Sequence, residues 1–421
     1  MGSLPRYTSH VAVWTCRCRG RRPDRRRHPL RSDRRRGLIH DHCSAFHPMG
    51  IGSPYLSKLD LERYGLIWRW AEVDCAHPLD NGDAGVLYRS LEQTAAGLGA
   101  DGPRWQRMFG DLSTGFDALA SDLMRPIVNV PRHPLRLAGF GPRALLPATV
   151  TAKLWKTDRR KALFGGVAAH AFYPLNRPAT SAVGLMITAA GHRYGWPVAE
   201  GGSRSITDAM SAMLPRSRRQ DRHRHSGSHW PPRFRTPMLF CWMSIRGALE
   251  ILGDRLPGRV ARAYRKFKQA PERSRSILRS KVMCRGPIRI ALGPELSIWQ
   301  VVSTKSWPLS QYLADSPDPP GTLIRCTPMR TCYTDMPATL RRRSFIVATT
   351  SSGTADLAQD NPNQVGGDII GGANTELQHG IAGTYLCSAS TPPGAGAHGM
   401  CGYNAAESAL KYLRRKGAEV L

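Results

Sequence analysis

The sequence lacks both features that would place the chain in a membrane or export it. No apolar run approaches the roughly 20 residues that a membrane-spanning helix needs. The arginine-rich N-terminal stretch also lacks the apolar segment of about 7 to 15 residues that a secretory signal carries. We therefore expect a cytoplasmic protein with no transmembrane segment, for which only peripheral membrane contact remains open.

Metal-binding patterns are missing as well. The 10 cysteines are scattered without the paired CxxC spacing of zinc sites. A cytoplasmic chain of 421 residues is not expected to depend on disulfides. His40, His42 and His47 are clustered, but no fourth ligand follows at a metal-binding spacing. We expect no metal site.

Acidic residues are scarce, since 60 Lys+Arg stand against 31 Asp+Glu and give a formal net charge of +29. Residues 1–40 hold 12 Lys/Arg against 2 Asp/Glu, and residues 211–346 hold 26 against 8. Such clusters are typical of nucleic-acid-binding proteins, in which they release counterions from phosphates. Arg17–Arg36 and Arg216–Arg235 lack aromatic residues interleaved at the stacking intervals that single-strand binders use. We therefore do not expect a nucleic-acid partner, and nucleic-acid binding is kept as the alternative function.

Ordinary globular patterning runs through residues 41–214, which we expect to be mostly helical. Asp101 can cap a helix whose apolar residues recur at about 3.6-residue spacing: Trp105, Met108, Phe109, Leu112, Phe116 and Leu119. A second helical stretch is predicted over Leu154–Phe164. This region can therefore supply one apolar core.

The pattern largely fails in residues 215–345, apart from an island at residues 245–268. Arg273–Arg289 follows neither the helical nor the strand period, so it predicts no regular element. Order returns in residues 346–421. There the sequence predicts a strand at Thr384–Leu386, a Gly/Pro loop, and a helix at Asn404–Arg415 with basic residues in its last turn.

The segment that begins at Gly383, GTYLCSASTPPGAGAHGMCGYNAAESAL, resembles the final flavin-contact motif of phytoene-desaturase-like and amine-oxidase-like flavoproteins. Gly394, Gly396 and Gly399 would let backbone amides approach the cofactor without interference from a Cβ atom. The helix that follows would aim its N-terminal dipole at the flavin and favour the negative charge of the reduced ring.

Four other stretches resemble the same subfamily in the same order. They are HDHCSAFHPMGIGSPYL at His40–Leu56, AHPLDNGDAGVLYRS at Ala76–Ser90, GWPVAEGGSRSITDAM at Gly195–Met210 and NPNQVGGDIIGGAN at Asn361–Asn374. The agreement in both content and order supports the resemblance, because chance matches would not follow the order of the family's motifs.

The resemblance implies an FAD-dependent oxidoreductase, in which bound FAD takes a hydride from a hydrophobic or amine-like small molecule. It implies an α/β (α+β) fold: a Rossmann-like FAD-binding domain, incomplete here, with an inserted helical or mixed substrate domain. Such sites often need no acid or base side chain, so no catalytic residue is assigned. The implied cofactor-binding residues are Gly201, Gly202, Ser388, Ala389, Ser390, Pro393, Gly394, Gly396, His398, Gly399 and Met400.

Several of these positions also allow a purely structural role. His398 can face the isoalloxazine ring or pack, and Gly201 and Gly202 can form a simple turn. Cys387 and Cys401 are expected to be packing residues, and many relatives carry a Gly-Asp pair where this chain has Cys387 and Ser388. The remaining glycine cluster could serve a substrate-side loop or a tight turn: Gly366, Gly367, Gly371 and Gly372.

The family begins with a strand, a GxGxxG turn and a helix that seats the ADP half of FAD. This sequence has no such turn near its N-terminus, and in place of the family's second motif, a glycine run followed by Arg and an acidic residue, it has RRPDRRRHPLRSDRRRG. Back-translation with a shifted reading frame turns Pro23–Asp33 into PTVGGTRCEVT, which resembles a second FAD motif, and Lys268–Ala291 into AGPGAFKVDPALEGDVPWPNPDC. We interpret both basic blocks as codons read out of frame, with residues 1–40 as the remnant of the FAD-binding βαβ unit. On this interpretation the chain binds no FAD, and the remaining alternative is a decayed gene without function.

Overall fold

The computed structural model describes residues 44, 46–79, 83–126, 129–171, 174–213, 240–242, 245–266, 273–280, 298–302, 309–313, 322–326, 344–352, 381, 384–394 and 396–415. Most of the two basic blocks therefore lies outside the described residues, as do His40, His42, Gly383, Gly417 and the glycine cluster at 366–372. No helix of the described part is long and apolar enough to cross a membrane.

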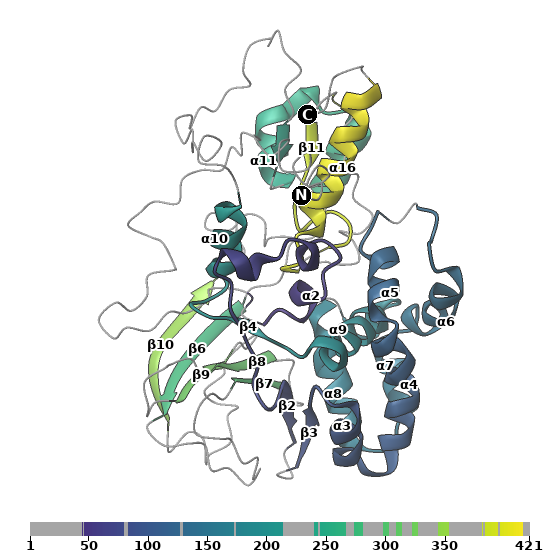
Figure 1. The fold of residues 1–421 in the computed structure, drawn as a ribbon, viewed down its shortest axis with the longest axis vertical. Helices are drawn as coiled ribbons and strands as arrows, with labels where there is room; N and C mark the ends of the chain where they lie inside the picture. The colour runs from purple at the N-terminus through teal and green to yellow at the C-terminus, as the bar shows by residue number, and fades with distance from the viewer. Residues whose placement is uncertain are drawn as a thin grey trace, which may run out of the picture.

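Helices between residues 91 and 194 form the main packed body (Figure 1). They are α3 (Leu91–Gly97), α4 (Gly102–Thr114), α5 (Phe116–Leu123), α6 (Pro134–Ala144), α7 (Ala148–Lys153), α8 (Asp158–Ala168) and α9 (Thr180–Tyr194), with 3-10 turns η3 (Gly99–Asp101) and η4 (Ala169–Ala171). Helix α9 packs against α4, α6, α7 and α8. Trp105, Phe109, Phe164 and Leu185 are fully buried where these helices meet. The apolar stripe predicted from the sequence is therefore part of this core.

The structure corrects the predicted extent of two helices. The stripe that begins after Asp101 is interrupted at Gly115, where α4 ends and α5 begins, because glycine is a poor helix former. Asp101 occupies the N-cap position of α4, but its side chain does not cap it. Its carboxylate instead accepts hydrogen bonds from the backbone N–H groups of Lys156 and Thr157. Leu154–Thr157 is consequently a connection, and the second helix begins at Asp158.

Two sheets lie beside the helical body (Figure 1). One has the order β3-β2-β7-β8, with strands β2 (Cys75–Pro78), β3 (Ala84–Leu87), β7 (Ile298–Val302) and β8 (Leu309–Leu313). The other has the order β10-β6-β9, with β6 (Arg273–Ser280), β9 (Thr322–Cys326) and β10 (Ser344–Ser352). Strand β6 lies where the sequence pattern predicted no regular element. Its backbone pairs with a neighbour on each side, and such pairing does not require an apolar alternation.

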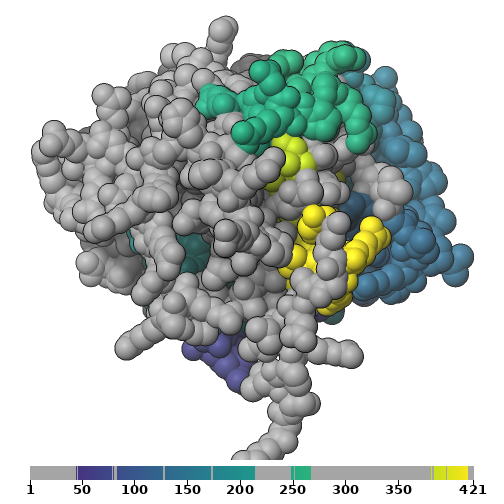
Figure 2. Space-filling model, turned by 90° about the horizontal axis from the view of Figure 1, so that it is seen from above, coloured from purple at the N-terminus to yellow at the C-terminus, as the bar shows by residue number. Residues whose placement is uncertain are grey.

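The C-terminal segment combines a parallel strand pair with helices (Figure 1). Strand β11 (Thr384–Leu386) pairs in parallel with β5 (Phe240–Trp242), and Leu386 packs on α11 (Ile245–Leu252) and α12 (Gly258–Lys266), which the turn η6 (Gly253–Arg255) joins. The predicted strand is confirmed. Helix α16 (Met400–Arg415) begins four residues before the predicted Asn404, since Tyr403 N–H already bonds to the Gly399 carbonyl. In the space-filling view the yellow surface of α16 lies below the green surface of α11–α12 and to the left of the blue helical region (Figure 2).

Short elements connect these parts. They are α2 (Pro48–Ile51), η1 (Leu56–Lys58), η2 (Leu61–Tyr64), the antiparallel pair β1 (Trp68–Arg69) and β4 (Val198–Ala199), and α10 (Arg204–Ala212). Figure 1 shows α2 between the helical body and the C-terminal segment. This placement brings an N-terminal motif next to the loop before α16.

Candidate cofactor-contact site

Three stretches singled out in the sequence meet at the start of α16. The Ser53 hydroxyl donates a hydrogen bond of 2.6 Å to the His398 carbonyl, across 345 residues of sequence. A Cβ atom on Gly50 would lie 3.0 Å from the Ala397 carbonyl oxygen, so the backbone of α2 closely approaches the same loop. The HPMGIGSP stretch thus forms one wall of the candidate site.

His47 links this wall to the turn that carries Gly201 and Gly202. Its backbone N–H donates to the Pro197 carbonyl at 2.9 Å, and its Nε2 lies 2.8 Å from the Ser203 hydroxyl. Because that hydroxyl donates to the Ser44 carbonyl, it accepts from His47, which places the imidazole proton on Nε2. No described residue hydrogen-bonds the buried Nδ1. Burial lowers the pKa of His47 to about 4, so the ring is neutral at pH 7.

Gly201 and Gly202 form a tight turn between β4 and α10. Their φ angles of 77° and 92° lie in the left-handed region that glycine adopts without a steric penalty. The Gly202 N–H donates to the Ala199 carbonyl, which closes the turn. Ser203 links the turn to His47 and Ser44, so its described hydrogen bonds fit the structural reading of these two glycines.

The loop from Ser388 to Gly399 folds back over the beginning of α16. The Ser388 carbonyl accepts from the N–H and the hydroxyl of Thr391, and the Thr391 carbonyl accepts from the Gly394 N–H. A cis peptide bond joins Pro392 to Pro393. The side-chain amide of Asn404 donates to the carbonyls of Pro392 and Met124. These bonds fix the loop to α16 and to the helical body.

The buried side chains of Cys401 and His398 make polar contacts with the backbone of the turn that precedes α16. The Cys401 thiol lies 3.4 Å from the Thr391 carbonyl and 3.2 Å from the Gly394 carbonyl, and burial raises its pKa to about 11. The thiol is therefore protonated and serves packing, as expected. The Nδ1 atom of His398 accepts from the Met400 N–H at 3.1 Å, and burial lowers the pKa of this ring to about 4. A neutral His398 thus satisfies one free amide at the start of α16.

The three glycines of the loop all have positive φ: Gly394 at 109°, Gly396 at 153° and Gly399 at 69°. A Cβ atom on Gly396 would lie 2.7 Å from His398 Cδ2, and one on Gly399 would lie 3.0 Å from Tyr55 Cδ1. The first turn of α16 carries no acidic side chain. The positive end of the helix therefore keeps its capacity to stabilise negative charge.

The sequence reasoning singled out the loop residues but not the residues that anchor them. Ser53, Thr391 and Asn404 do most of the positioning, although each lies inside a motif stretch. Ser53 and Asn404 bond to partners 345 and 280 residues away, so no local pattern could identify their role, whereas Thr391 bonds to the nearby Ser388. Within the described part of the chain, no group of three or more His, Cys, Asp or Glu residues could hold a metal ion.

No family model and no curated protein matches this chain in sequence. Its fold is similar to that of an oxidoreductase from Methanosarcina mazei, with a TM-score of 0.52 and 11% identity over 88% of this chain and 87% of that one. A putrescine oxidase redesigned in its cofactor binding gives a TM-score of 0.51 at 10% identity, covering 86% of this chain and 87% of the other. Cyclohexylamine oxidase from Brevibacterium oxydans gives 0.51 at 11% identity, covering 90% and 88%. The chain therefore shares the fold of these three proteins.

Proposed function

We propose that this chain derives from an FAD-dependent oxidoreductase of the phytoene-desaturase-like type, and that the flavin ring belongs against the loop at residues 388–400. The hydrogen bond from Ser53 to His398 carries this proposal, because it joins two stretches that resemble flavin-side motifs of one family. The amine oxidases that share the fold support the same reaction class.

The residues present fit the ring half of the cofactor. Ser388, Gly394 and Gly396 lie in a loop anchored to the positive end of α16, which favours electron-rich groups. When bound, FAD would supply the hydride acceptor, and the chain would position it and a small hydrophobic or amine-like substrate.

The chain lacks the motif that holds the ADP half of FAD in this family. The GxGxxG turn that should follow an N-terminal strand is missing from the sequence, and residues 1–43 lie outside the described part. We propose that the chain has lost tight FAD binding and that both basic blocks arise from shifted reading frames. Sequencing the gene tests the second point, since codons that do not shift as proposed would refute it.

A flavin that has the ring but no ADP half tests whether the loop binds the ring, independently of whether the ADP-binding motif has been lost. We expect the purified full chain to be colourless after gel filtration, whereas added lumiflavin should show fluorescence quenching as it binds the loop. Gly396→Ala should weaken this binding, because alanine at φ 153° is strained and its Cβ would displace His398. The matched control is Gly65→Ala, which has a φ of 93° but open space around it.

Two outcomes would contradict the proposal. Stoichiometric FAD that survives gel filtration would show that the ADP seat is not lost. Equal lumiflavin quenching by wild type and Gly396→Ala would remove the loop as the ring site. Retention of the same preparation on DNA, lost with added salt, would instead favour the alternative of nucleic-acid binding.

A further inference from the structure

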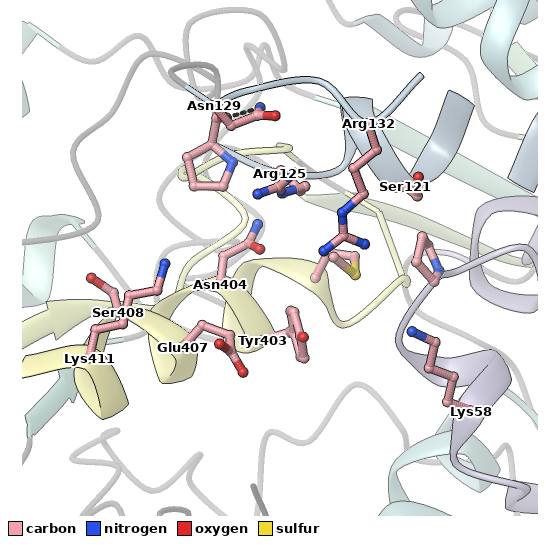
Figure 3. Close-up of a pocket in the computed structure, with 13 residues that line it drawn as sticks. Lys58, Ser121, Arg125, Asn129, Arg132, Tyr403, Asn404, Glu407, Ser408 and Lys411 are labelled. Atoms are coloured by element: carbon pink, nitrogen blue, oxygen red, sulfur yellow. Dashed lines mark hydrogen bonds between the residues drawn. The ribbon is translucent and has the colours of Figure 1, made fainter. Parts of the chain in front are cut away.

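A cavity of about 360 Å³ lies along the side of α16 (Figure 3). Its walls come from three separate parts of the chain, which are residues 54–58, 121–132 and 400–411. Of the residues implied in flavin contact, only Met400 reaches it. The volume is within the range of about 300 to 1,000 Å³ that is usual for small-molecule sites.

The charge around this cavity is strongly one-sided. Lys58, Arg125, Arg132 and Lys411 line it, and Glu407 is its only acidic lining residue. Within the described residues, none of the four basic side chains forms an ion pair. Figure 3 shows the Arg132 guanidinium directed toward α16, with Arg125 beside it and Lys58 on a separate segment. Their positive charge is thus available to a ligand.

The loop that carries Arg132 is held in place. The buried carboxylate of Asp122 accepts hydrogen bonds of 2.8 Å from the backbone N–H groups of both Arg132 and His133. The Asn129 side chain donates to the Pro126 carbonyl within the same loop. Opposite it, Asn404 is fixed to Met124 and Pro392. Both walls are therefore organised before any ligand arrives, which limits the entropy lost on binding.

The arginines also act on the hydroxyl of Tyr403, which lines the same cavity. Burial and the nearby Glu407 raise the pKa of Tyr403, whereas the charges of Arg132 and Arg125 oppose that rise. Both arginines line the cavity together with Tyr403. Guanidinium groups recognise carboxylate and phosphate oxygens through paired hydrogen bonds.

We propose that this cavity binds a small organic anion, with its carboxylate or phosphate group between Arg125 and Arg132 and with Lys58 and Lys411 at the edges. An amine would be repelled by the same four cations, so the site is separate from that of any amine-like substrate. The proposal does not depend on flavin binding, because it requires only residues of the helical body, the 54–58 segment and α16.

Calorimetric titration of the full chain tests this at low ionic strength, with inorganic phosphate in one arm and succinate in the other. We expect one of the two anions to bind. Arg132→Gln and, on a different segment, Lys58→Gln should each weaken that binding by about fivefold or more, since charged hydrogen bonds at exposed positions contribute about 1 kcal/mol. Both side chains are exposed, so the fold should survive, which circular dichroism checks.

Arg143→Gln is the matched control, because Arg143 is exposed on neighbouring α6 and lies outside the cavity. Its affinity should stay within about twofold of wild type, the scale of an exposed charge. If Arg143→Gln weakens binding as much as Arg132→Gln, the anion responds only to the net charge of +29 and the proposal fails. It also fails if wild type binds neither phosphate nor succinate.

Discussion

Replacing Asp101 by alanine should destabilise the helical body more than any exposed charge substitution. The Asp101 side chain is fully buried and accepts from Lys156 N–H at 2.9 Å, Thr157 N–H at 2.6 Å and the Thr157 hydroxyl at 2.8 Å. It also lies 3.7 Å from a guanidinium nitrogen of the fully buried Arg160. Removing one partner of a buried ion pair costs about 3–5 kcal/mol, because the other charge stays buried without compensation.

A loss of this size is a large fraction of the total stability of a domain, which is about 5–15 kcal/mol. The guanidinium of Arg160 lies 4.3 Å from the ring centre of Trp155 and 5.5 Å from that of Trp105. Tryptophan fluorescence during urea unfolding should therefore report on this site directly. We expect the midpoint for Asp101→Ala to fall far below that of wild type.

Two further variants make the test decisive. Asp158→Ala removes an exposed i,i+3 pair with Lys161 and should lower the free energy of unfolding by less than about 1 kcal/mol. The double variant Asp101→Ala/Arg160→Met should lose less unfolding free energy than the sum of the losses in the two single variants, since no charge is left buried. If Asp101→Ala and Asp158→Ala have equal effects, the reasoning on the buried pair is wrong.

Two other predictions concern pH and the loop glycines. Burial lowers the pKa of His47, His192 and His398 to about 4 from the usual 6.5, so stability should be complete above pH 6.5 and fall as the pH drops toward 4. Urea midpoints measured across this window check it, and a midpoint that does not change with pH would contradict it. Gly399→Ala should lower the free energy of unfolding by about 1–2 kcal/mol because of its φ of 69°. Thermal unfolding should show a smaller shift for Gly97→Ala, a helical position with open space.

Patterns in short stretches of sequence predicted a helix and a strand whose residues lie within those same stretches. The apolar stripe from Trp105 to Leu119 predicted helix, and the short apolar run Thr384–Leu386 predicted a strand that the structure confirms. The break at Gly115 and the early start of α16 at Met400 shifted the boundaries, which are decided by single hydrogen bonds rather than by periodicity.

Features that depend on distant partners could not be predicted in this way. Asp101 has the residue type and position of a helix cap, yet it binds backbone groups 55 and 56 residues away. The pairing of Ser53 with His398 likewise exists only once the chain has folded. The family resemblance singled out both of these stretches, whereas periodicity describes one segment at a time.

The glycine spacing at 394–399 shows why context decides the meaning of a motif. Gly394, Gly396 and Gly399 have the G-x-G-x-x-G spacing of a dinucleotide-binding turn, and α16 follows directly. In that motif the strand ends immediately before the first glycine, but here residues 387–393 separate it from β11 and include a cis-proline bond. At Gly396 and Gly399 the spaces where Cβ atoms would lie are taken by the side chains of His398 and Tyr55. At these two glycines the protein itself therefore occupies the approach to the backbone that a pyrophosphate would need, so the spacing alone does not make this turn a dinucleotide site.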